Sequence, residues 1–274
     1  YGTIKFYKEC IEQCIKPIIG CEMYVSKRTR HDKEAGLDSD SNHLILLAKN
    51  KKGYKNLMKI ISVANLEGYY YRPRSDLELL KEFSEGLICL SACINGFVSQ
   101  PLLEGQEDTA IERAKTLSKI FGEENFYLEI QKHINIDKQD ILNEKLIDLS
   151  GKLSIPLVAT NDNHYIYPQD AEAQETLLCI QTQRTLNDKD RRLTMISSPD
   201  FYIKSKEEMI GMFLNVPQAL ENSSKIADMC NVEIALGQWI MPLFDVPNKK
   251  SPAKFIKEKV EEGLKNRYKK ITKD

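Results

Sequence analysis

The sequence predicts an α/β fold built on a parallel sheet or barrel, and three observations support this prediction. Short apolar, β-branched runs alternate with longer segments whose apolar residues recur at helical spacing. The alternation is regular from residue 86 to residue 180, where each of three strands is followed by a helix. Breakers such as Gly122 and Pro156 separate these segments. In such folds the functional side chains lie at the carboxyl ends of the strands.

The predicted elements that precede this alternation are arranged differently. Apolar residues over 4–14 predict a first helix, and we expect the chain to begin within a helix of a longer protein. Residues 18–25 and 43–48 predict two strands, and the polar segment between them lacks an apolar helical stripe. Because a parallel return needs a crossover helix, we expect an antiparallel hairpin, which brings His43 towards Glu22.

Cap residues predict where the other helices begin. They are the capping boxes Ser75 with Glu78 and Ser205 with Glu208, Pro217 in a first turn, and Ser251 before Pro252. The β-α rhythm stops near residue 186. We therefore predict a partial barrel over residues 1–185, a helical extension over 186–246, and over 247–274 a linker with the first helix of a further domain.

Composition and charge restrict the class of protein. With 42% hydrophobic and 29% charged residues, no apolar run of bilayer length and no signal peptide, the sequence predicts a cytoplasmic protein without a membrane partner. Seven scattered cysteines favour a reducing compartment. Residues 247–274 carry a net charge of +6 and the remainder −7, so the body is a poor nucleic-acid binder by itself. The basic segment either contacts phosphates or is a solvated helix face.

Five candidate metal ligands fall at or near the ends of predicted strands. Strand side chains alternate faces, so Asp162 and His164 after the strand 156–160 point the same way and suit zinc or manganese. Each candidate also has a simpler explanation, namely a polar turn, a small core thiol or a hydrogen-bonded histidine. A glutamate within a strand is unusual unless it is paired or ligating. Their repetition at successive strand ends favours a ligand cluster of Glu22, His43, Cys93, Asp162 and His164.

Two further features carry weaker signals. Arg72 and Arg74 beside three tyrosines are candidates for binding single-stranded DNA through phosphate pairing and base stacking, with a loop packed on the body as the alternative. His133 lies just beyond the strand 126–130 and matches no ligand position, so we predict a surface histidine.

Ordered phrases along nearly the whole chain resemble one family. They are IKPIIGCE (15–22), HLILLAKN (43–50), GYKNLM (53–58), EGYYYRPR (67–74), SEG (84–86), LSAC (90–93), PLVATND (156–162), LLCIQT (177–182), ALEN (219–222) and CNV (230–232). With them the chain closely resembles the polymerase-and-histidinol-phosphatase (PHP) domain of the alpha subunit of bacterial replicative DNA polymerase III.

The resemblance implies a distorted PHP-type β/α barrel that lacks its first strands and has a C-terminal helical extension. It implies a divalent metal cluster (zinc, manganese or magnesium) at one mouth, and the five candidates fall on family ligand positions. The family's earlier H-x-H and Asp-His pairs would precede Tyr1, so we expect this piece to bind metal weakly and to hydrolyse little or no phosphoester alone.

The resemblance also implies a function and partners. The parent would be a DNA-directed DNA polymerase, a nucleotidyltransferase whose palm follows Asp274, with the rest of the alpha subunit, other replisome subunits and DNA as partners. The PHP site is a 3′–5′ proofreading exonuclease in some bacterial replicases and structural in others. Two alternatives stay open, namely a non-catalytic interaction domain and a stand-alone PHP phosphoesterase, and the helices after Leu186 argue against the latter.

Overall fold

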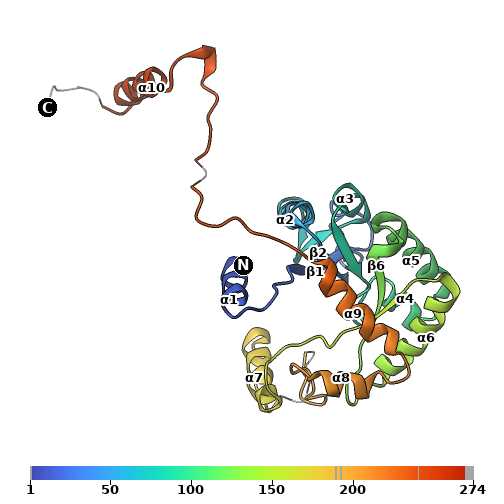
Figure 1. Cartoon of the computed structure of the whole chain (residues 1–274). Coiled ribbons are helices and arrows are strands. Elements are labelled where there is room, and N and C mark those ends of the chain that lie inside the picture. The colour runs from blue at the N-terminus through green and yellow to red at the C-terminus, as the bar shows by residue number, and fades with distance from the viewer. Residues whose placement is uncertain (1, 189, 192, 240, 269–274) are drawn as a thin grey trace. The chain divides into compact units, whose positions relative to one another are not determined.

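A computed structural model of the chain describes residues 2–188, 190–191, 193–239 and 241–268 (Figure 1). The chain divides into two compact units, residues 1–234 and residues 235–274. The end of the predicted segment 247–274 lies outside the described residues from 269 onward. The predicted boundaries at residues 185 and 246 remain predictions.

The first unit is built on a seven-stranded mixed sheet with the order β3-β4-β1-β2-β5-β6-β7. Its strands are β1 (Gly20–Ser26), β2 (Ser41–Ala48), β3 (Tyr69–Tyr70), β4 (Arg72–Ser75), β5 (Leu87–Leu90), β6 (Phe126–Ile130) and β7 (Leu157–Ala159). β1 and β2 form the predicted antiparallel hairpin, and β5, β6 and β7 are parallel as predicted. Among the described residues the edge strands β3 and β7 do not pair with each other, so this barrel-type sheet is open.

Strand direction decides which strand ends meet. β4 is parallel to β1, and β2 is antiparallel to both β1 and β5. Five strands (β4, β1, β5, β6 and β7) therefore run the same way, and the start of β2 lies beside their carboxyl ends. This edge of the sheet is where the candidate ligands were predicted.

The helices follow the apolar periodicity of the sequence. They are α1 (Thr3–Glu12), α2 (Lys51–Leu66), α3 (Leu77–Glu82), α4 (Ser99–Leu103), α5 (Glu107–Phe121), α6 (Asp137–Leu153), α7 (Ala171–Thr182), α8 (Lys206–Met212), α9 (Pro217–Met229) and, in the second unit, α10 (Pro252–Arg267). α2, α5 and α6 pack on the sheet (Figure 1). They cover the larger core, which includes Leu44, Leu46, Ile60 and Leu117. No helix of the described part of the chain is both long and apolar enough to cross a bilayer.

The other face of the sheet carries a smaller apolar cluster, next to the edge where the candidate ligands were predicted. Ile88, Leu90, Tyr127 and Val158 form this cluster with residues of α9, which packs against β7. The register pairs Glu22 with Ile45, Ile45 with Leu90, and Leu90 with Tyr127. Because side chains alternate along a strand, Glu22, His43 and Glu129 project from the same face as this cluster.

Most of the predicted caps are confirmed. Ser205 and Glu208 form the capping box of α8, Pro217 opens α9, and Ser251 caps α10. The capping box at Ser75 is wrong, because Ser75 ends β4 and the carboxylate of Asp76 caps α3 instead. The tyrosine-rich segment, for which a loop packed on the body was the alternative to a DNA contact, forms the paired strands β3 and β4.

Candidate metal centre

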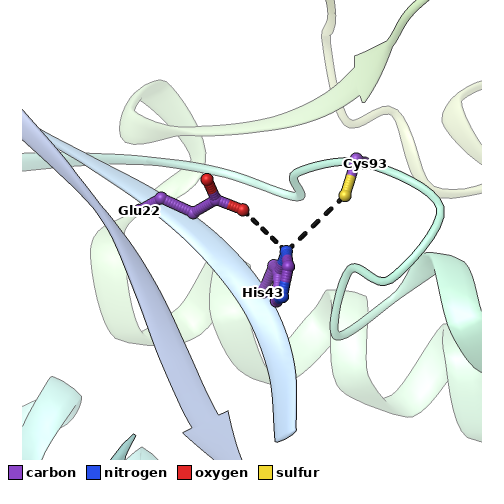
Figure 2. Close-up of side chains that lie close together, drawn as sticks. All are labelled: Glu22, His43 and Cys93. Carbon is purple, nitrogen blue, oxygen red and sulfur yellow. Dashed lines mark hydrogen bonds and ion pairs between the residues drawn. The ribbon is translucent and has the colours of Figure 1, made fainter. Parts of the chain in front are cut away.

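Three of the five predicted ligands converge at the carboxyl edge of the sheet, as Figure 2 shows. Glu22 lies on β1, His43 on β2 and Cys93 in the loop after β5. Glu22 Oε1 is 2.6 Å from His43 Nδ1, and Cys93 Sγ is 3.6 Å from the same nitrogen. The three ligand atoms lie within 4.8 Å of one another. The prediction that the hairpin brings His43 towards Glu22 is confirmed.

A tight turn presents Cys93 to His43. The backbone of His43 accepts from the Phe97 N–H and donates to the Asn95 carbonyl at 3.0 Å, which fastens the loop to the start of β2. Within the loop, the Gly96 N–H donates to the Cys93 carbonyl at 2.8 Å. A Cβ on Gly96 would lie 2.1 Å from the Ser91 carbonyl oxygen, so this turn requires glycine.

Asp162 and His164 form a second pair beyond the end of β7. His164 Nε2 lies 3.6 Å from Asp162 Oδ1, and the His164 N–H donates to the Phe201 carbonyl at 2.8 Å. The predicted reason for their proximity, strand alternation, is wrong because β7 ends at Ala159. A turn with Asp162 in the left-handed region (φ 48°) brings the two side chains together.

Electrostatic interactions connect this pair to the first three residues. Burial by itself would raise the pKa of Asp162. Its interactions with His164, His133 and His43 are stronger in sum, so the pKa of Asp162 is lowered. Asp162 in turn raises the pKa of His164, and Glu22 adds to that shift. The two groups of candidates therefore lie within electrostatic range of each other.

The thiol of Cys93 is held in its neutral form. Burial raises the pKa of Cys93 to about 12, and the nearby carboxylates of Asp162, Glu22 and Glu129 act in the same direction. A thiol is a metal ligand as its thiolate, so a cation bound here must displace this proton.

His133 is not the surface histidine that we predicted. Its side chain is 2% exposed, stacks on Phe201 with ring centroids 4.0 Å apart, and has Nδ1 3.4 Å from Asp200 Oδ1. Burial lowers its pKa. Phe201 and Asp200 lie far along the chain, so the local sequence carried no signal of this contact.

The two arginines proposed for DNA differ in their surroundings. Arg74 is 0% exposed, so the prediction that it grips DNA is wrong. Its guanidinium donates at 2.8–3.1 Å to the carbonyl oxygens of Asp32, Asp38 and Gly68. Arg72 is exposed and stacks over the Tyr24 ring at 4.7 Å, so its role at the surface stays a prediction.

One buried carboxylate beside the candidate ligands was not predicted from the sequence. Glu129 of β6 is 4% exposed, and burial raises its pKa to about 7. Its signal in the sequence was a charged residue inside the apolar run FYLEI.

Comparisons with known proteins agree with the fold. Residues 1–133 match the PHP domain family. These residues are a PHP domain, a class of domain that binds metal ions, and Glu22, His43 and Cys93 are a possible metal site in it.

The chain is also similar to larger proteins. It is 44% identical over 275 residues to DNA polymerase III subunit alpha of Borreliella burgdorferi and 41% over 270 residues to that of Treponema pallidum. The corresponding protein of Thermus aquaticus is 38% identical over 279 residues. These alignments cover 98–99% of this chain and 22–24% of the relatives. The chain therefore carries a PHP domain of the kind found in DNA polymerase III alpha subunits and spans about a quarter of their length.

Proposed function

We propose that the chain is the PHP module of a replicative DNA polymerase alpha subunit and that its polar mouth binds a divalent metal. The mouth comprises Glu22, His43, Cys93, Asp162 and His164. The convergence of a carboxylate, an imidazole and a thiol within 4.8 Å carries this proposal. These groups come from three separate segments, and Cys93 lies 50 residues from His43.

The donor set fits a metal ion. Zinc takes nitrogen and sulfur ligands at about 2.0–2.3 Å, which places neighbouring ligand atoms a few ångströms apart. The separation of 3.6 Å between Cys93 Sγ and His43 Nδ1 suits such a site. Thiolate and imidazole favour zinc, whereas carboxylates also suit manganese and magnesium. Asp162 and His164 would supply further ligands from the other side of the mouth.

The chain's own residues orient this site. Glu22 holds the His43 ring at 2.6 Å, and the carbonyl of Phe201 fixes the backbone of His164. A divalent metal held by these residues would supply Lewis-acid chemistry, through which a phosphate is polarised and the pKa of an attacking water is lowered. Phosphoester hydrolysis, including 3′–5′ exonuclease proofreading in the intact subunit, is the reaction that such a site supports.

Metal titration tests the proposal. We expect the chain to bind Zn²⁺ weakly and to lose this binding in Cys93→Ser, whereas Cys14→Ser, an exposed thiol outside the mouth, keeps it. Nucleotide release from the 3′ end of labelled single-stranded DNA, measured with the same samples, tests hydrolysis. If the chain binds no metal in this titration, the proposal is wrong and the five residues of the mouth have only a structural role.

A second candidate is a non-catalytic interaction or stability domain of the replicase. It is favoured by the net charge of −7 over residues 1–246, which opposes direct binding to DNA phosphates. Retention of other polymerase subunits on the immobilised chain would support it. A stand-alone phosphoesterase would instead turn over a small phosphomonoester and retain none of these subunits.

The proposed partners and location follow from the proposed parent protein. They are the rest of the alpha subunit, other replisome subunits and DNA, all in the cytoplasm. Arg72 is the residue of this chain that we propose for contact with DNA, because its guanidinium is exposed beside aromatic rings.

A further inference from the structure

We propose that Glu129 is a positioning residue that ties the loop carrying Cys93 to the strand end carrying Asp162. The inference rests on the proposed function, since it concerns the same metal site. Glu129 lies on β6, between β5, which leads to Cys93, and β7, which leads to Asp162.

The carboxylate of Glu129 accepts hydrogen bonds from both neighbouring segments. Its Oε2 accepts from the Ala92 N–H at 3.1 Å, beside Cys93. Its Oε1 accepts from the Thr160 hydroxyl, two residues before Asp162, and from Gln131 Nε2 at 3.0 Å. One side chain thus bridges the two halves of the mouth.

The bond to Ala92 supports an unusual backbone conformation. Ala92 has a φ of 61°, in the left-handed region that residues with a Cβ rarely adopt. Its buried N–H donates to Glu129, and the Glu129 N–H donates to Ser91 Oγ at 2.8 Å. Loss of the carboxylate would free the loop next to Cys93 to relax.

Thr160 connects Glu129 to the other side of the mouth. The Thr160 N–H donates to the Ile130 carbonyl at 3.1 Å, and its hydroxyl also lies 3.3 Å from Gln131 Nε2. The residue that follows β7 is therefore held by β6 through both its backbone and its side chain. This contact sets the direction in which the chain leaves the sheet towards Asp162.

A carboxylate suits this position better than an amide. Three donors converge on Glu129, and a carboxylate offers two acceptor oxygens, whereas an amide offers one and adds its own donors. Burial disfavours the charged form and raises the pKa of Glu129 to about 7. The cost of burying this carboxyl group is offset by the three hydrogen bonds through which it ties the two segments together.

The test compares Glu129→Gln with Glu175→Gln in the 274-residue chain. Glu175 is a matched control, since it is 1% exposed and also accepts from a threonine hydroxyl (Thr194) and a backbone N–H (Met195). The first readout is the affinity for Co²⁺, which is measured through the thiolate-to-cobalt absorption. This absorption also reports a bond between the metal and Cys93. The second is the alkylation rate of Cys93 in metal-free protein, measured by peptide mapping.

We expect Glu129→Gln to weaken Co²⁺ binding about tenfold, as for other residues that orient metal ligands, and to reduce the thiolate absorption. Cys93 should be alkylated faster in this variant. Glu175→Gln should leave both readouts unchanged. Wild-type values of both readouts in folded Glu129→Gln would overturn the proposal.

Two further outcomes are decisive. If Glu129→Gln does not fold, Thr160→Val removes the same link from the Asp162 side, and unchanged Co²⁺ affinity and Cys93 alkylation in that variant would refute the proposal. If the wild-type chain binds no Co²⁺, the proposed function fails, whereas the alkylation rates in metal-free protein still decide whether Glu129 positions the loop.

Discussion

Two polar clusters of the first unit both contain buried acidic groups, but these groups differ in their electrostatic state. In the arginine–carboxylate network, Asp38 is hydrogen-bonded by Arg28, and Asp76 lies 3.1 Å from Arg30. Arg28 lowers the pKa of Asp38 to about 2. Each buried carboxylate of this network faces a cation from its own chain, so the network is complete without a ligand.

The polar mouth differs because its acidic groups are compensated unevenly: Asp162 is paired with His164, whereas the thiol of Cys93 and the neighbouring carboxyl of Glu129 are buried near other carboxylates. Burial raises the pKa of Glu129 to about 7 and that of Cys93 to about 12. Their charged forms become favourable when a cation enters, which is the condition of a metal site. Buried carboxylates paired with cations of the same chain therefore indicate a cluster that stabilises the fold, whereas buried acidic groups whose ionisation is disfavoured indicate a site for a cation.

The largest effect is expected beside the arginine–carboxylate network, where Arg74 donates to the Asp38 carbonyl and Arg74→Ala should destabilise the first unit by about 3–5 kcal/mol. The substitution leaves three backbone carbonyl oxygens without their buried donor. Chemical denaturation followed by circular dichroism measures the loss. A loss below about 1 kcal/mol would show that water replaces the guanidinium and that the network is not structural.

Within the mouth, His43→Ala should weaken Zn²⁺ binding on the order of 100-fold, because it removes the imidazole shared by Glu22 and Cys93. The free energy of unfolding without metal should change far less than in Arg74→Ala. His31→Ala is the matched control, since His31 is an exposed histidine beside Glu67. Equal metal affinity in the two variants would contradict the assignment of His43.

The affinity for Zn²⁺ should fall about tenfold for each unit that the pH is lowered between about pH 8 and pH 6. Cys93 is protonated throughout this range because burial, with Asp162, Glu22 and Glu129 nearby, raises its pKa to about 12. Binding therefore releases at least this one proton. Isothermal titration in buffers of different ionisation enthalpy counts the protons, and a pH-independent affinity would exclude Cys93 as a ligand.

A smaller effect is expected for the pH dependence of stability in Glu129→Gln. The raised pKa of Glu129 contributes stability below the usual pKa of glutamate, and this contribution is lost as the pH rises through about 7. The variant lacks this loss, so its unfolding free energy relative to wild type should increase from about pH 5 to about pH 8. A constant difference in denaturation experiments would mean that Glu129 titrates normally.

The smallest effect is expected for Arg72→Ala, which should change stability by less than about 0.5 kcal/mol, because Arg72 is exposed. If Arg72 contacts a phosphate, the salt dependence of single-stranded DNA binding should decrease by about one unit of slope. An unchanged slope would leave Arg72 as a residue that only stacks on Tyr24.

Much of the fold was predictable because short-range patterns encode it. The strand 126–130 was predicted with the bounds that β6 has. β2 alternates buried and partly exposed residues as a half-buried strand should, and Ser205 with Glu208 caps α8 as expected. The proximity of Glu22 and His43 also followed from the sequence, because the polar connection left a hairpin as the simplest topology.

Other contacts depend on partners far along the chain. Arg74 was misassigned because its carbonyl acceptors at Asp32 and Asp38 come from the connection between β1 and β2. His133 was misassigned because Phe201 and Asp200 cover it. No local pattern reports such burial, since the covering residues are brought in by the path of the whole chain.

The order of strands and helices, their caps and the five ligand candidates are encoded in neighbouring residues, since backbone hydrogen bonding and side-chain alternation act over a few positions. Which candidates meet depends on packing between distant segments. The turn at Gly96, the left-handed backbone of Ala92 and Asp162, and the carboxylate of Glu129 are set by contacts across the sheet. Those contacts form when β5, β6 and β7 lie side by side.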